Sequence, residues 1–346
     1  MLQIIESFNN LSEAITELDK VNLSQDESHT FATDILKAIE ECIEVIQLAA
    51  PKHVNSNDGT DFLTESVLNT IDNLAKFVLR NTKPGTGPIV LDTPSVGLRL
   101  ESDSIDNITD ATVVIGDGNG FTLPSADKLF ANQTLGDGTF NRIVIHLKRR
   151  GDSVNDVLSL SFTDRAGNEI EVKDTDEDIV ITFASTPPEQ GTNTLITGLY
   201  QDDDNVTYFG STFNVSRLFH ATIIMLVSNE SVLWNCTAYI FNDVLKYSKH
   251  YRGYRFSVDV LFHGDHSTIF IPEDYFLMTG EYYLTFSVPG NQRAYFSMTV
   301  KQTVCTYLDK NTTTWGRQGC KVSSASNMTS TVCLCNHLTT FTVESI

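Results

Sequence analysis

The chain has 346 residues, a hydrophobic content of 41% and a formal net charge of −20 at pH 7. This length allows more than one domain, and the composition is that of a globular protein rather than a disordered one. The negative charge argues against nucleic acids and anionic lipid surfaces as partners, and no apolar run reaches the roughly 18 residues of a membrane helix.

The first 20 residues do not resemble a signal peptide. They have neither a basic start nor a continuous apolar core. We therefore expect the chain to be an excised fragment of a larger protein.

The apolar spacing at the start of the chain predicts helices. An apolar residue recurs at every third or fourth position of the first segment: Ile4, Phe8, Leu11, Ile15 and Leu18. Ser24 and Glu27 have the spacing of a capping box for a second helix, which carries a stripe including Cys42. A third stripe runs from Val67 to Val78. We predict a small helical domain over residues 1–85.

The pattern changes at residues 81–88, NTKPGTGP, where two prolines and two glycines interrupt it. The segments that follow are short and alternate with a period of two, as in RIVIHLK at 142–148. Many such segments, separated by Gly, Asp and Asn turns, predict an antiparallel β-sandwich over residues 90–346. The predicted fold class is therefore α+β, with the small helical subdomain before a large sandwich.

Acceptor sites for N-glycosylation are dense along the chain. Asn-x-Ser/Thr begins at Asn10, Asn22, Asn107, Asn132, Asn205, Asn214, Asn229, Asn235, Asn311 and Asn327. Together with clustered cysteines, this density predicts a secreted or cell-surface glycoprotein.

The cysteines favour disulfides over a metal site. Four of the six lie in the last 42 residues: Cys305, Cys320, Cys333 and Cys335. A zinc site is the alternative, but C-x-C is unlike the usual zinc knuckle. Two cysteines on one strand face are poorly placed to bond to each other, so one of Cys333 and Cys335 should bond to Cys305 and the other to Cys320. We expect Cys42 and Cys236 to be free and buried; the alternative is a bridge between the domains.

Acidic turns at 116–120, 174–178 and 202–204 are the candidate calcium ligands. None has the full EF-hand spacing, so we interpret them as solvated turns and keep calcium as the alternative. No other cofactor or metal is expected.

His337, Leu338 and Thr339 supply a base, a carbonyl and a hydroxyl within three residues. If His337 takes the Thr339 hydroxyl proton, the oxygen can attack the Leu338 carbonyl carbon in an N-to-O acyl shift, and water then hydrolyses the ester. Asn336 or backbone amides would donate to the oxyanion. Alone, the tripeptide is equally compatible with ordinary strand sequence.

The residues around this tripeptide resemble the GPS proteolysis motif, which ends a GAIN domain. The segment from Cys305 reads CTYLDKNTTTWGRQGCKVSSASNMTSTVCLCNHLTTF, over residues 305–341. The matching positions are Cys305, Trp315, Gly319, Cys320, Thr331, Cys333, Cys335, His337, Leu338, Thr339 and Phe341. GAIN domains occur in adhesion-type G-protein-coupled receptors and in polycystin-like proteins, with helices before a β-sandwich.

The resemblance implies a single-turnover cis-autoprotease that cuts between Leu338 and Thr339 and acts on no external substrate. It implies the disulfides Cys305–Cys333 and Cys320–Cys335. It also implies that the fragments stay associated through the last strand, next to membrane segments of the parent protein on the extracellular side of the plasma membrane. The extracellular ligand is unknown, and no nucleic acid is expected.

Two positions depart from the pattern. Leu308 stands where the motif has its first tryptophan, which leaves open a cleavage-incompetent structural or adhesion domain of the same fold. Glu344 interrupts the segment that is apolar in adhesion receptors. This interruption favours a relative of polycystins or egg-jelly receptors over an adhesion receptor. The short helical part and FLMTGEYYLTF at 276–286 favour the same interpretation.

Overall fold

The structure is a computed structural model and describes most of the chain. The described residues are 2–18, 21, 23–49, 57–108, 112–116, 118–131, 138–148, 156–185, 194–196, 198–201, 206–228, 235–241, 256–261, 266–276, 278–289, 296–310 and 312–346. The chain divides into two compact units. Unit 1 comprises Met1–Ala184, Cys305–Lys321 and Cys333–Glu344, and unit 2 comprises Ser185–Val304, Val322–Val332 and Ser345–Ile346. This division does not test the domains 1–85 and 90–346, which stay a prediction.

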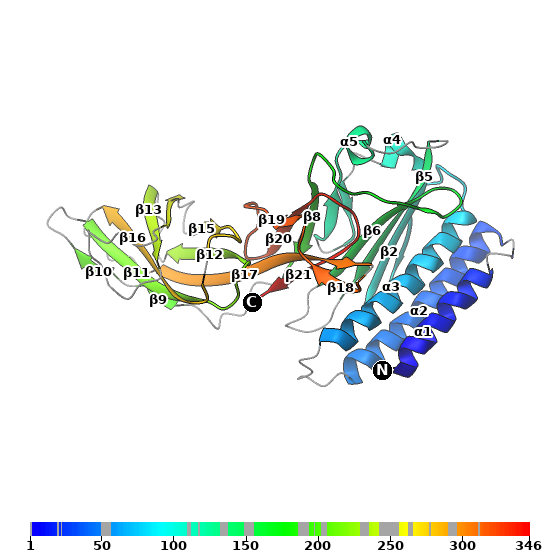
Figure 1. Ribbon diagram of the computed structural model, residues 1–346, viewed down its shortest axis with the longest axis horizontal. Helices are drawn as coiled ribbons and strands as arrows, with labels where there is room; N and C mark the ends of the chain where they lie inside the picture. The colour runs from blue at the N-terminus through cyan, green and yellow to red at the C-terminus, as the bar shows by residue number, and fades with distance from the viewer. Residues whose placement is uncertain are drawn as a thin grey trace. The chain divides into compact units, whose positions relative to one another are not determined.

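Three helices open unit 1 (Figure 1): α1 (Leu2–Leu18), α2 (Gln25–Ala49) and α3 (Asn57–Arg80). The predicted capping box of α2 is confirmed. The Ser24 amide donates to Glu27 Oε2 at 2.9 Å, and the Glu27 amide donates to Ser24 Oγ at 3.3 Å. These bonds occupy backbone amides at the helix start that have no partner within the helix.

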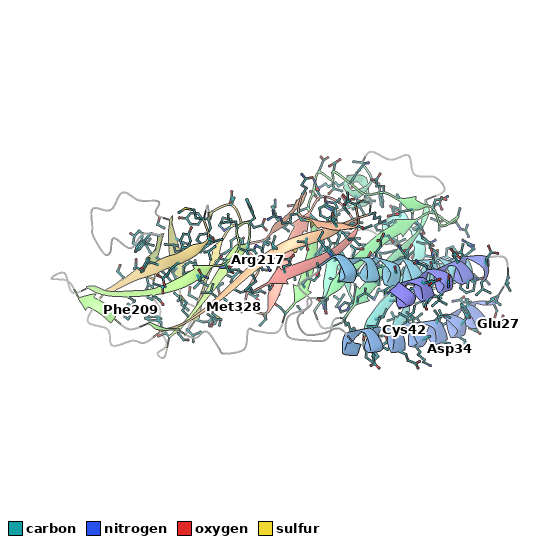
Figure 2. All side chains as sticks on the ribbon, turned by 60° about the horizontal axis from the view of Figure 1, so that its bottom comes forward. Glu27, Asp34, Cys42, Phe209, Arg217 and Met328 are labelled. Carbon is teal, nitrogen blue, oxygen red and sulfur yellow. A yellow bond between two sulfur atoms is a disulfide. The ribbon has the colours of Figure 1, made fainter. Side chains whose placement is uncertain are left out.

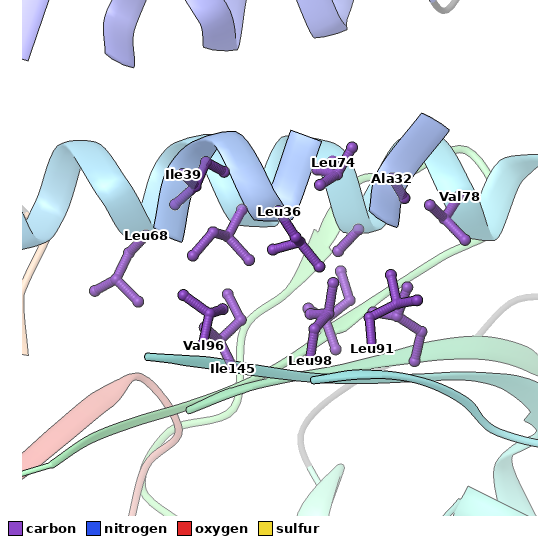
Figure 3. Close-up of a cluster of buried hydrophobic side chains, with 14 of the residues drawn as sticks. Ala32, Leu36, Ile39, Leu68, Leu74, Val78, Leu91, Val96, Leu98 and Ile145 are labelled. Atoms are coloured by element: carbon purple, nitrogen blue, oxygen red, sulfur yellow. The ribbon is translucent and has the colours of Figure 1, made fainter. Parts of the chain in front are cut away.

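The helices cover a sheet whose strands are all antiparallel to their neighbours. Its strands in unit 1 include β1 (Ile89–Asp92), β2 (Val96–Ser104), β5 (Thr139–Leu147), β6 (Val157–Thr163) and β21 (Thr340–Ser345), in the order β1-β2-β5-β6-β21. Figure 3 shows side chains of α2 and α3, such as Leu36 and Leu68, directed at Val96, Leu98 and Ile145 of this sheet. Burial of these apolar side chains stabilises the helix-on-sheet layer.

A buried carboxylate also joins α2 to the sheet. Glu40 Oε2 accepts hydrogen bonds from the Ser95 amide and Thr93 Oγ1, and its Oε1 accepts one from Ser95 Oγ, each at 2.7 Å. These bonds offset the cost of burying a charged group.

The remaining elements of unit 1 are short. They are α4 (Ile105–Ile108), α5 (Ala126–Leu129), β3 (Thr112–Val114), β4 (Gly120–Thr122), β7 (Glu169–Ile170), β8 (Ile179–Ala184) and β18 (Thr314–Gly316). A second sheet has the strand order β19-β20-β8-β4-β3, where β19 is Cys320–Val322 and β20 is Ser330–Cys335. The helices and antiparallel sheets confirm the predicted α+β class.

Unit 2 is built from strands around an aromatic core. Its strands are β9 (Thr194–Ile196), β10 (Gly198–Gln201), β11 (Val206–Val215), β12 (Ala221–Ser228), β13 (Asn235–Phe241), β14 (Phe256–Leu261), β15 (His266–Ile271), β16 (Gly280–Pro289) and the first part of β17 (Phe296–Asp309). Phe296 meets Phe209 and Phe286 edge to face, with ring centroids 4.9 and 5.1 Å apart. Such contacts add to the apolar burial that stabilises the unit.

The prediction that Cys42 is buried is wrong. Cys42 is a free, exposed thiol on α2 (Figure 2), whereas Cys236 is buried on β13. The inner face of α2 carries Leu36, Ile39 and Glu40. Because each helical residue turns about 100°, Cys42 lies roughly 110° around the axis from the middle of this face, beyond its edge at Ile39. Among the described residues, no helix is long and apolar enough to cross a membrane.

Candidate functional site

The His337–Leu338–Thr339 segment lies between β20 and β21, just after two disulfides. Cys305 bonds to Cys333 and Cys320 to Cys335, with Cα–Cα distances of 5.9 and 4.2 Å. This is the pairing that the resemblance implied. Each disulfide ties β20 to a segment earlier in the chain and limits how far the residues that follow can move.

Backbone hydrogen bonds hold the segment on either side. The Asn336 amide donates to the Gly319 carbonyl at 3.0 Å, and the Thr175 amide donates to the Asn336 carbonyl at 2.9 Å. The Leu338 amide donates to the Val172 carbonyl at 2.9 Å. The backbone of the candidate site is therefore fixed by the loop before β8 and by the turn before β19.

His337 is a largely buried histidine between two strands. Burial lowers the pKa of His337, and the charge of Asp174 opposes this effect. Its Nδ1 lies 3.2 Å from Asn336 Oδ1, while its buried Nε2 has no hydrogen-bond partner among the residues that the structure describes. Tyr307 meets the imidazole edge to face, with ring centroids 4.5 Å apart. A neutral imidazole with an open nitrogen can accept a proton.

Thr339 Oγ1 donates a hydrogen bond to the Leu308 carbonyl at 3.1 Å. Leu308 is buried on β17, at the position where the motif has a tryptophan. The hydroxyl is thus held by a main-chain carbonyl of β17 and not by His337. Transfer of its proton to His337 requires Thr339 to leave this carbonyl.

Residues 340–345 form an inner strand of the sheet. In β21, Thr340, Phe341 and Thr342 pair with Ser159, Leu158 and Val157 of β6, and β17 lies on the other side. Phe341 and Val343 are 1% and 3% exposed. Thr342 Oγ1 donates to the Asp156 carbonyl at 2.8 Å, and Thr306 Oγ1 donates to the Thr342 carbonyl at 3.2 Å. Many non-covalent contacts therefore hold β21 in place.

Sequence reasoning missed the part that two residues play beside His337, namely Tyr307 and Gly319. Tyr307 carries no sequence signal for a role at His337, because the contact depends on how β17 passes the site. Gly319 matches the motif, but no physical reason for a glycine at this position is visible in the sequence. Its φ is +77°, and a Cβ there would lie 2.3 Å from Asn336 Oδ1. Glycine is therefore needed for both the turn and the space.

The predicted glycosylation sites differ in their surroundings. Asn10, Asn107, Asn214 and Asn327 are exposed, and Asn235 begins β13. Asn22, Asn132, Asn205, Asn229 and Asn311 lie outside the described residues. Asn327 Oδ1 accepts bonds from the Thr329 and Ser330 amides, so this side chain shapes a turn.

The acidic turn 174–178 holds ion pairs with lysines. Glu177 pairs with Lys128, and Asp178 pairs with Lys321 at 3.2 Å. Residues 202–204 and residue 117 lie outside the described part of the chain. Calcium at these turns stays a prediction.

Residues 282–343 match the family described as GPS, GAIN subdomain B. Over 277 residues the chain is 25% identical to Polycystin-1-like protein 3 of Mus musculus; the alignment covers 74% of this chain and 12% of that protein. The chain thus spans only a small part of the curated relative that it matches.

Two solved structures are also similar to parts of the chain. One is the enzymatically active domain of bacteriophage CBA120 tailspike protein 4, at 12% identity and a TM-score of 0.22, covering 38% of this chain and 18% of that one. The other is the collagen binding domain of Erysipelothrix rhusiopathiae surface protein RspB, at 9% identity and a TM-score of 0.22, covering 75% and 80%. Both TM-scores are low, so neither similarity carries an argument.

Proposed function

We propose a self-cleaving function for this chain, on the premise that it contains a GAIN/GPS domain and resembles polycystin-like proteins. The cut falls between Leu338 and Thr339. It happens once per molecule, in cis, and no external substrate is turned over.

In the first step His337 Nε2 takes the hydroxyl proton of Thr339, and Oγ1 attacks the carbonyl carbon of Leu338. The new C–O bond replaces the C–N bond, and the Thr339 nitrogen leaves as an amine after receiving the proton from His337. Water then hydrolyses the ester. The products are a carboxylate at Leu338 and a free hydroxyl and amine at Thr339.

The state of His337 is the observation that carries this proposal. A lowered pKa leaves the imidazole neutral at pH 7, and its buried Nε2 has no competing partner. Nucleophile and target are adjacent in the chain, so little entropy is lost on approach. The disulfides and the hydrogen bonds of residues 336 and 338 hold the segment in one position, which supports a reaction that needs a defined approach of the hydroxyl to the carbonyl.

We also propose the setting of the reaction. The chain is an extracellular juxtamembrane module of a polycystin-like membrane protein, and cleavage occurs in the secretory pathway. Its partners are its own C-terminal strand, the membrane segments of the parent protein and an extracellular ligand, with no role in nucleic-acid binding. The disulfides, the glycosylation sequences and the polycystin-like relative support this setting.

A cleavage-incompetent domain of the same fold is the second candidate. The observation in its favour is the hydrogen bond from Thr339 Oγ1 to the Leu308 carbonyl, because it engages the proton that His337 would have to take. In that case the segment would serve structure or adhesion alone.

Intact mass under denaturing conditions separates the two candidates. We expect the glycosylated, secreted wild-type chain to appear as residues 1–338, with residues 339–346 as a separate peptide. His337→Ala and Thr339→Ala should remain whole, while Thr339→Ser keeps a hydroxyl and should still be cut. If the wild type and Thr339→Ser are both found whole, the second candidate holds.

A further inference from the structure

The side chain of Asn336 lies against the proposed base. Asn336 Oδ1 is 3.2 Å from His337 Nδ1, and the backbone of Asn336 is fixed at both its amide and its carbonyl. Its neighbour Cys335 is tied to Cys320. Asn336 is therefore one of the most constrained residues of the site.

With the amide oxygen toward the ring, this contact favours a proton on the imidazole nitrogen that faces it. An amide oxygen only accepts hydrogen bonds, so the nitrogen that faces it must donate. With the proton on Nδ1, a neutral imidazole keeps its lone pair on Nε2. Within the described part of the chain, Nε2 is the buried nitrogen that has no hydrogen-bond partner.

The space for Asn336 depends on Gly319. A Cβ at position 319 would lie 2.3 Å from Asn336 Oδ1 and 3.0 Å from His337 Nδ1. Any larger residue would push the amide away from the imidazole. Tyr307 contacts the imidazole edge to face and limits its rotation.

We propose that Asn336 is a positioning residue that fixes His337 in the tautomer with the proton on Nδ1, and that Gly319 provides the room for it. This inference rests on the proposed self-cleavage, because it assigns Asn336 a role in presenting Nε2 to Thr339. Asn336 touches neither the attacked carbonyl nor the nucleophile in this role, so it acts through His337 alone.

The imidazole nitrogens can be observed directly by nitrogen NMR of the full chain. The sample is the Thr339→Ala protein, which stays uncut, labelled in its 8 histidines. A second spectrum with His337→Ala added identifies the His337 signals. We expect a protonated Nδ1 and an unprotonated Nε2.

Asn336→Ala in the same background removes the acceptor. The ratio of the two tautomers should fall by about five- to tenfold, the size expected for one lost hydrogen bond. Asn336→Asp should move the titration of His337 to higher pH, because a carboxylate favours the charged imidazole. The matched control is Asn9→Ala, an exposed asparagine on α1, which should leave the His337 signals unchanged.

The inference and the proposed function fail in different ways. A proton on Nε2 in the Thr339→Ala protein overturns the inference, even if the Asn336 variants do not fold. An unchanged tautomer ratio in folded Asn336→Ala overturns it as well, whether or not the wild type is cut. A whole wild-type chain with Nδ1 protonated would instead reject self-cleavage and leave the tautomer assignment standing.

Discussion

At the scale of single residues, the pKa of His337 is set by two opposing effects. Burial disfavours the charged imidazole and lowers the pKa from 6.5, while the carboxylate of Asp174 partly opposes the shift. In the proposed mechanism, only a neutral His337 can accept the Thr339 proton. Cleavage should therefore continue below the pH at which an exposed histidine would be protonated, and stop as the pH falls through the lowered pKa.

Asp174→Asn should extend cleavage to still lower pH. The change removes the charge that favours the imidazolium, and asparagine tolerates the φ of +51° at this position. The measurement is the rate at which labelled precursor, folded in microsomes at different pH values, is converted to residues 1–338 and 339–346, separated under denaturing conditions. Asp176→Asn, in the same acidic turn, is the control. A shift of the acid limb to higher pH in Asp174→Asn would contradict this account of the site.

The sequence alone was enough to predict His337, Leu338 and Thr339 as the candidate residues, because the motif fixes their spacing. It did not predict that Thr339 binds the Leu308 carbonyl or that Tyr307 contacts His337. Both contacts depend on where β17 passes the segment, and such long-range placement leaves no local pattern.

At the scale of elements, β21 is held in its sheet by non-covalent contacts with its neighbours and by no disulfide of its own. Both disulfides end at Cys333 and Cys335, before the proposed cut, and residues 339–346 contain no cysteine. After cleavage, the ladder to β6 and the burial of Phe341 and Val343 would retain the strand.

Phe341→Ala should weaken retention of the cleaved strand by about 3–5 kcal/mol, the usual cost of truncating a buried phenylalanine. Phe341 is 1% exposed and contacts Phe121, with ring centroids 6.4 Å apart. Release of the peptide over time, followed by size exclusion and mass spectrometry, measures the effect. Ile346→Ala, at a residue that is 56% exposed, should change release little. Equal release from both variants would show that β21 is not held by its apolar face.

A second prediction at this scale concerns Glu40 and the contact between α2 and the sheet. Glu40→Ala leaves the Ser95 amide and two hydroxyls without their acceptor. The free energy of unfolding should fall by roughly 2–4 kcal/mol, since bonds to a charged acceptor are among the stronger ones. Denaturant titration beside the exposed neighbour variant Glu41→Ala tests this. If both variants unfold at a similar denaturant concentration, the buried carboxylate of Glu40 does not stabilise the contact between α2 and the sheet.

Helices were easier to predict than sheet order. The apolar period and the capping box locate α1 to α3, because these signals are local. The position of β21 between β6 and β17 joins segments far apart in the sequence, which a period of two does not specify. The burial of Cys42 was predicted incorrectly because Glu40, a polar residue, occupies the inner face of α2.

At the scale of the whole molecule, the cysteines have three distinct environments. Four are in disulfides, Cys42 is exposed and Cys236 is buried. An alkylating reagent should modify Cys42 alone in the native protein and Cys236 as well after denaturation. The other four should react only after reduction. Peptide mapping by mass spectrometry reads each site, and modification of Cys305 or Cys320 without reductant would contradict the assigned disulfides.

Self-cleavage is tested most directly by exposing the secreted wild-type chain to denaturant and identifying what it releases. We predict an eight-residue peptide, TTFTVESI, with a free amine at Thr339, and a main chain that ends at Leu338. Before denaturation the two should elute together. A single chain of residues 1–346 after denaturation would contradict the account.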